Sequence, residues 1–122
     1  NRRTFGGADF APAADFGLLR LAWERAQARG LQVRVGTVVT SDDFYGPAES
    51  MAVWSEHGVL AVEMETSALY TVAARHRVAA LSILTVSDVI GGTAIMHPDD
   101  RERSLTPMAE LALEVAAAAQ GG

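Results

Sequence analysis

The chain has 122 residues, of which 49% are hydrophobic and 20% charged, and this profile predicts one globular domain and excludes extensive disorder. Fifteen acidic residues against ten basic ones give a net charge of −5, and the basic residues form no cluster, so nucleic acid is not the expected partner. Cysteine is absent, which excludes disulfides and Cys–zinc sites and favours a reducing compartment, so we expect a cytoplasmic protein. No stretch reaches the ~18 consecutive apolar residues of a membrane span, so we expect no membrane partner.

Segments with apolar residues at helical spacing alternate along the chain with short apolar or β-branched runs typical of strands. In chain order, the pattern predicts a helix over 15–29, a strand over 31–39, a helix over 48–57, a strand over 59–62, a helix over 66–76, a strand over 78–86 and a helix ending near 119. Regular alternation of helices and strands indicates an α/β fold, with a parallel or mixed sheet between layers of helices.

Two of these elements also carry predictions about burial. In the helix over 66–76, we expect Leu69, Val72 and Ala73 to face inward. The strand over 78–86 is almost continuously apolar, which is typical of a strand buried on both faces.

The start of the last helix has two interpretations. Thr106 followed by Pro107 suits an N-cap and first helical position. A start near Asp99 would instead place Pro107 inside the helix and kink it. Both interpretations separate Arg101 from the anchored part of the helix, so residues 98–107 could form a hinged lid, and a static surface turn is the alternative.

Polar residues follow the predicted strands, where ligands of α/β sheets usually bind. Glu63, Met64 and Glu65 end one strand, Ser87-Asp88 end another, and the loop at 44–45 leaves a third. In an extended chain the two glutamates would point to the same side, where sugar hydroxyls could satisfy both. The alternative is that each acid only caps the helix or turn that follows it.

The run Val-Glu-Met-Glu-Thr-Ser-Ala-Leu-Tyr at 62–70, Thr-Val-Ser-Asp at 85–88 and Phe-Tyr at 44–45 together resemble bacterial hexameric-type purine nucleoside phosphorylases. This resemblance implies an α/β three-layer sandwich with a mixed central β-sheet flanked by helices, of which residues 1–122 would form the carboxyl-terminal portion of a single domain. It also implies phosphorolysis of purine ribonucleosides or deoxyribonucleosides to the free base and the sugar 1-phosphate, with inorganic phosphate as co-substrate and neither cofactor nor metal.

The resemblance also assigns roles to individual positions. Asp88 would be the general acid that protonates purine N7 as the glycosidic bond breaks, and Arg101 would assist that proton transfer. Glu65 would accept hydrogen bonds from ribose hydroxyls, Met64 would pack on the sugar, and Phe44 would pack on the base. The full set expected to bind substrate is Phe44, Val62, Glu63, Met64, Glu65 and Ser87. Without the resemblance, Arg101 would be interpreted as a solvated charge at a helix end.

The family holds phosphate with a glycine-containing loop and arginines from the amino-terminal half, partly from a neighbouring subunit, and no such loop occurs in this sequence. The expected partners are therefore a purine nucleoside, phosphate, an amino-terminal segment that supplies the phosphate site, and further copies of the protein as a trimer of dimers. Two alternatives remain open. One is a nucleosidase that hydrolyses purine nucleosides or methylthioadenosine, and the other is a non-catalytic fragment for nucleoside binding or assembly.

Overall fold

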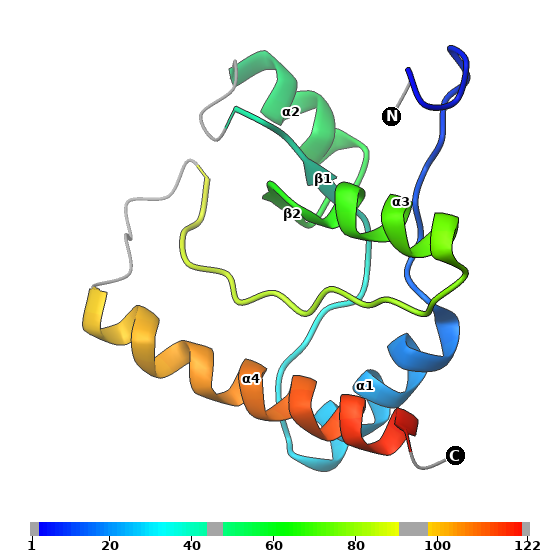
Figure 1. Cartoon of the computed structure of the whole chain (residues 1–122). Helices are drawn as coiled ribbons and strands as arrows, with labels where there is room; N and C mark the ends of the chain where they lie inside the picture. Colours follow the sequence, from blue (N-terminus) through cyan, green and yellow to red (C-terminus); the bar gives the residue numbers. More distant parts are fainter. Residues whose placement is uncertain (1–2, 44–47, 91–97, 121–122) are drawn as a thin grey trace. The chain divides into compact units, whose positions relative to one another are not determined.

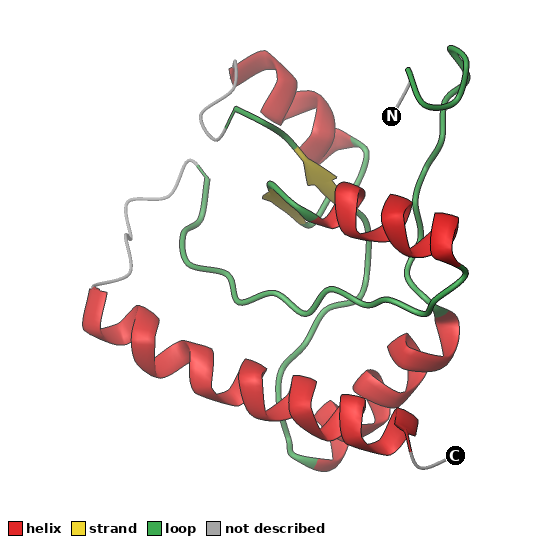
Figure 2. Ribbon diagram, viewed as in Figure 1, coloured by secondary structure: helices red, strands yellow, loops and turns green. Residues whose placement is uncertain are grey.

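The computed structural model describes residues 3–43, 48–90 and 98–120, and for Ala48 and residues 98–104 the description is limited to the backbone. Four helices and two strands occur in these residues. Figures 1 and 2 show how the chain runs through them. In chain order they are α1 (Phe16–Ala28), β1 (Val38–Thr40), α2 (Ala48–Glu56), β2 (Ala61–Glu63), α3 (Thr66–His76) and α4 (Pro98–Gln120).

The chain divides into two compact units. Unit 1 comprises Asn1–Asp15 and Arg34–Leu81, and unit 2 comprises Phe16–Val33 and Ser82–Gly122. Unit 1 therefore contains β1, α2, β2 and α3, whereas unit 2 contains α1 and α4.

The helices α1, α2 and α3 form where the apolar spacing predicts them, to within one residue at each end. The predicted end of α1 is also confirmed. Gly30 has a φ of +67°, and the N–H of Leu31 donates to the Ala26 carbonyl at 2.9 Å. This left-handed closing turn favours glycine, which has no Cβ to clash with the backbone.

In unit 2, α1 packs against α4 through a small apolar core. Ala22 and Ala26 of α1 are 7% and 1% exposed, and Leu111 and Val115 of α4 are 3% and 4% exposed. Arg29, just beyond α1, donates to two glutamates one turn apart on α4, Glu110 at 2.5 Å and Glu114 at 3.1 Å. Because partly exposed ion pairs contribute only about 0–1 kcal/mol, burial of the four apolar side chains stabilises this helix pair more than the ion pairs do.

In unit 1, β1 and β2 pair in parallel, with Val38 opposite Ala61 and Thr40 opposite Glu63. The pairing continues one residue further, because the N–H of Ser41 donates to the Glu63 carbonyl at 2.9 Å. Helix α3 follows β2 after a two-residue bend and contacts β1. The start of α3 therefore lies at the carboxyl end of this two-stranded sheet.

Two strand predictions are wrong, one in the length of the strand and the other altogether. Of the strand predicted over 31–39 only the last residues pair, and the segment predicted as a strand over 78–86 belongs to no strand. Val78 and Val86 are 59% and 60% exposed, so the prediction of burial on both faces is also wrong. An apolar run predicts that side chains should be buried, whereas a strand also needs a neighbouring backbone to accept and donate its hydrogen bonds.

Two further predictions about helices are corrected. Ala73 of α3 is buried as expected, at 7% exposed, but Leu69 and Val72 are 47% and 57% exposed and do not face inward. The other buried residue of this helix is Thr66, at 5% exposed. Helix α4 begins at Pro98 and continues through Pro107, so the interpretation with an N-cap just before this proline is wrong and the earlier start is confirmed.

No helix within the described ranges combines the length and apolar character that crossing a membrane requires.

The buried contact between α1 and α4 leads to a stability prediction. Leu111→Ala should lower the free energy of unfolding by about 2–3 kcal/mol, because it removes buried methyl groups and leaves a cavity between the helices. The matched control is Leu113→Ala on the same helix, where the side chain is 71% exposed, and we expect a change within about 0.5 kcal/mol. Urea denaturation measures both, and equal effects would contradict the assignment of the core.

Candidate functional site

The candidate site in unit 1 is the turn that joins β2 to α3. Val62 and Glu63 are the last residues of β2, and the chain bends at Met64 and Glu65 before α3 begins at Thr66. Val62 and Glu63 are half-buried, whereas Met64 and Glu65 are exposed. The turn therefore presents its last two side chains to solvent and keeps the first two against the fold.

The carboxylate of Glu63 accepts hydrogen bonds at both oxygens. Its Oε2 accepts the backbone N–H groups of Glu65, at 2.8 Å, and Thr66, at 2.6 Å. Its Oε1 accepts the hydroxyl of Thr40, from the end of β1. The first N–H groups of a helix have no partner within the helix, and Glu63 supplies acceptors for them at the start of α3. The side chain of Glu65, which occupies the N-cap position, makes no such hydrogen bond.

Burial raises the pKa of the Glu63 carboxyl, but the hydrogen bonds it accepts outweigh burial and hold its pKa below the usual value. The donors are the hydroxyls of Thr40 and Thr66 and the backbone N–H groups of Glu65 and Thr66. Each favours the ionised form, because an ionised carboxylate only accepts hydrogen bonds. Glu63 is therefore a fixed negative charge at the start of α3, where the helix dipole also favours an anion.

The two glutamates of the motif consequently differ. The chain bends at Met64 and Glu65, so the extended conformation on which the same-side expectation for Glu63 and Glu65 depends ends with β2. The capping alternative is confirmed for Glu63 by its bonds to the start of α3.

Thr40 is part of this cluster, although nothing in the sequence singled it out. Its hydroxyl donates to Glu63 and accepts the N–H of Ser67 at 2.9 Å. Thr40 lies 23 residues before Glu63 and 27 before Ser67, and no local pattern reveals contacts over such separations. The available signal was a hydroxyl side chain at the end of a β-branched run, next to a polar turn.

The remaining expected residues lie elsewhere. Ser87 and Asp88 belong to unit 2, where the Ser87 hydroxyl donates to Oδ2 of Asp88 at 2.7 Å and both residues are half-buried. Arg101 lies in the first part of α4, over residues 98–104, where only the backbone is described, and Phe44 lies outside the described residues. Met64 and Glu65 are thus grouped with Glu63 in one unit, and Ser87 is grouped with Asp88 in the other.

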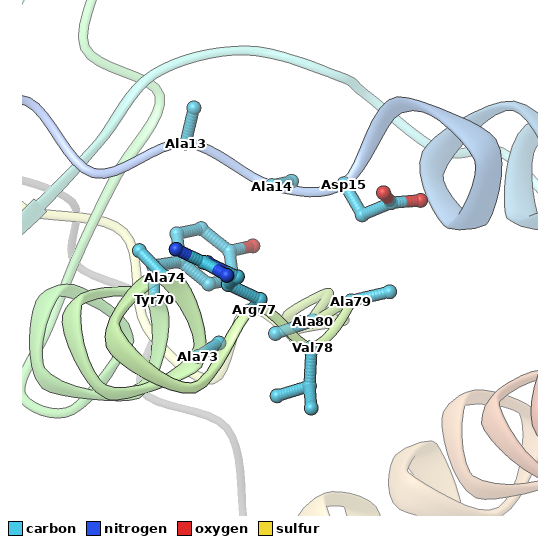
Figure 3. Close-up of a pocket in the computed structure, with 10 residues that line it drawn as sticks. All are labelled: Ala13, Ala14, Asp15, Tyr70, Ala73, Ala74, Arg77, Val78, Ala79 and Ala80. Carbon is cyan, nitrogen blue, oxygen red and sulfur yellow. The ribbon is translucent and has the colours of Figure 1, made fainter.

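Unit 1 also contains a pocket of about 300 Å³ between residues 13–15, α3 and the segment that follows α3 (Figure 3). Alanines form most of its lining, with Asp15, Tyr70 and Arg77 as its polar members. The N–H of Asp15 donates to the Ala80 carbonyl at 2.9 Å, so backbone pairing fixes one wall. Among the residues that the structure describes, none of those expected to bind substrate lines this pocket. Within the described residues, no group of three or more histidines and acids is arranged to hold a metal ion.

Comparison with known proteins gives a family match over nearly the whole chain. The profile of the phosphorylase superfamily matches residues 4–119. Relatives named DeoD-type purine nucleoside phosphorylase are 48% identical in Anoxybacillus flavithermus and Geobacillus stearothermophilus, over 116 residues, and 50% identical in Bacillus cytotoxicus, over 117 residues. Each match covers 95% of this chain and 50% of the relative, so the chain spans about half the length of the curated relatives it matches. The resemblance found in the sequence motifs is confirmed.

The cap at the start of α3 leads to a prediction for Glu63→Gln. At pH 7 the variant should be less stable by about 1 kcal/mol, because the neutral amide has one acceptor oxygen instead of two and cannot accept from both the Thr40 hydroxyl and the backbone N–H groups. A carboxyl with a lowered pKa contributes stability above its unfolded pKa and loses it as the pH falls through its folded value. The difference between wild type and variant should therefore shrink below the ordinary glutamate value of 4.5.

Urea denaturation at pH 7 and at about pH 3 tests this prediction. The control is Glu65→Gln, the same substitution on an exposed side chain two residues later, for which we expect a change below about 0.5 kcal/mol. Equal stability of wild type and Glu63→Gln at pH 7 would contradict the capping role.

Proposed function

We propose that this chain, which belongs to the phosphorylase superfamily, takes part in the phosphorolysis of purine ribonucleosides and deoxyribonucleosides to the free base and the sugar 1-phosphate. The observation that carries the proposal is the 48–50% identity to DeoD-type purine nucleoside phosphorylases over 95% of the chain. The capped turn at Glu63 supports it further, because it leaves the exposed Glu65 and Met64 at the carboxyl end of the parallel sheet, where ligands of α/β folds bind.

In the proposed reaction, the bond between the anomeric carbon and N9 of the purine breaks and its electron pair passes to the base. A phosphate oxygen forms the new bond to the anomeric carbon. Asp88, in its protonated form, donates to N7 and so neutralises the charge that develops on the leaving purine. The Ser87 hydroxyl holds Oδ2 of Asp88 at 2.7 Å, which supports a fixed orientation of the carboxyl group. Arg101 assists the transfer as a cation beside the acid.

Substrate binding is divided among the other residues. Glu65 accepts hydrogen bonds from the ribose hydroxyls and Met64 packs on the sugar, and the exposure of both side chains is compatible with contact to a ligand. Phe44 and Val62 line the base pocket together with Glu63. Because the Glu63 carboxylate already accepts from Thr40 and from the start of α3, its main contribution in this proposal is to fix the turn.

We further propose that residues 1–122 are the carboxyl-terminal portion of a single phosphorylase domain, a three-layer sandwich with a mixed central sheet, in a cytoplasmic trimer of dimers. The match covers 95% of this chain but only 50% of the relative, which supports the proposal that these residues are one portion of a larger domain. The exposed valines of the segment over 78–86 support it as well, because a neighbouring strand would bury them and satisfy the backbone. In this proposal the amino-terminal segment supplies the phosphate site, and phosphate is a co-substrate rather than a cofactor.

An assay of inosine cleavage with and without phosphate tests the proposed reaction. For the protein at its full natural length, we expect cleavage that depends strictly on phosphate, with ribose 1-phosphate as product. Cleavage without phosphate would indicate a nucleosidase, and no turnover would indicate a non-catalytic role. For the 122-residue chain by itself we expect no turnover, and full phosphorolysis by that chain would refute the proposed division of the domain.

Asp88→Asn should lower kcat for inosine by about 10²–10⁴, because the amide preserves the shape of the side chain but has no acidic proton to transfer. A purine nucleoside alkylated at N7 is the matched control substrate, since its base leaves without protonation, and it should lose far less. Steady-state kinetics on both substrates decides the role. Equal losses would mean that Asp88 has a structural role only.

A further inference from the structure

We propose that Thr40 is a positioning residue whose hydroxyl holds the turn at residues 63–65 in the conformation that presents Glu65 to the sugar of the substrate. The inference rests on the proposed function for the identity of the substrate. It concerns a side chain that lies on a different strand from the glutamates and that the motif does not include.

The geometry gives Thr40 two simultaneous contacts. Its Oγ1 donates to Oε1 of Glu63 and accepts the backbone N–H of Ser67 at 2.9 Å. A hydroxyl group has one proton to donate and lone pairs to accept, so it can satisfy both partners at once. Through these two bonds the end of β1 is connected to the last residue of β2 and to the first turn of α3.

The connection reaches Glu65 through Glu63. The Oε2 atom of the Glu63 carboxylate accepts the backbone N–H of Glu65 at 2.8 Å, while Thr40 occupies the other oxygen of the same group. Rotation of the Glu63 carboxylate would therefore break the bond that fixes the backbone of Glu65. Thr40 opposes that rotation, because its hydroxyl is itself held by the N–H of Ser67.

At the same point, Glu63 is held in two ways: a backbone hydrogen bond holds its main chain, and the Thr40 hydroxyl holds its side chain. The N–H of Ser41 donates to the carbonyl of Glu63 at 2.9 Å, so the main chain of Glu63 is fixed by β1 independently of Thr40. Removal of the Thr40 hydroxyl should thus leave the pairing of β1 with β2 intact and release only the carboxylate and the turn that it holds. This separation makes the role of the hydroxyl testable without unfolding the sheet.

The test compares three variants of the protein at its full natural length. Thr40→Val keeps the shape of the side chain and removes the hydroxyl, and Thr40→Ser keeps the hydroxyl. Thr37→Val is the matched control, the same substitution at an exposed threonine just before β1. We expect kcat/KM for a purine ribonucleoside to fall about tenfold in Thr40→Val, as for loss of one productive hydrogen bond, and to stay within about twofold of wild type in the other two.

A double-mutant cycle distinguishes positioning from a general loss of stability. If Thr40 acts through Glu65, Thr40→Val should cost less than about twofold in a Glu65→Gln background, because the group that it positions is already impaired. A tenfold loss that persists in full in that background, or an unchanged kcat/KM in Thr40→Val alone, would overturn the proposal.

Amide hydrogen exchange provides a readout that needs no substrate. Exchange at Glu65, Thr66 and Ser67 should accelerate at least about fivefold in Thr40→Val but not in Thr37→Val, since only the first variant releases the turn. Unchanged exchange at these amides would also overturn the proposal. Absence of nucleoside cleavage by the unmutated protein would instead overturn the proposed function, while the exchange data would still decide whether Thr40 holds the turn.

Discussion

The structure of the candidate site depends on how the first backbone N–H groups of α3 are satisfied. A helix start leaves these groups without partners in the helix, and here a carboxylate from the preceding strand accepts two of them. Because Glu63 supplies this cap from outside the helix, its side chain joins β2 to α3 and fixes the intervening bend. The neighbouring residues Met64 and Glu65 acquire a defined place at the sheet edge as a result.

This arrangement explains how two similar side chains in one short motif can have different functions. Hydrogen bonds to both oxygens of Glu63 lower its pKa and leave the carboxylate fully engaged by the protein. Glu65 contributes its backbone to that network but keeps its side chain exposed. A carboxylate that only accepts hydrogen bonds is suited to bind hydroxyl groups, provided that its own position is fixed. In the proposed enzyme, Glu63 provides the fixed position and Glu65 the contact.

The sequence predicted the local features of this structure and missed those that join distant segments. The bounds of α1, α2 and α3 followed from the helical spacing of apolar residues, which acts over a few residues of chain. The strand over 78–86 was predicted from side-chain character alone, although a strand exists only where another backbone pairs with it. Thr40 was missed for the same reason, since its partners lie more than 20 residues away.

The division of the site residues imposes a last constraint on the proposed chemistry. The turn with Glu65 belongs to unit 1 and Asp88 to unit 2, and the chain between them consists of α3 and the apolar segment over 78–86, whose first and last valines are exposed. In the proposed reaction the sugar contact and the acid act on one nucleoside, and such reacting groups are effective only when they are held close to the geometry of attack. Pairing this segment with another strand would bury Val78 and Val86, and each Å² of apolar surface removed from water would contribute about 25 cal/mol.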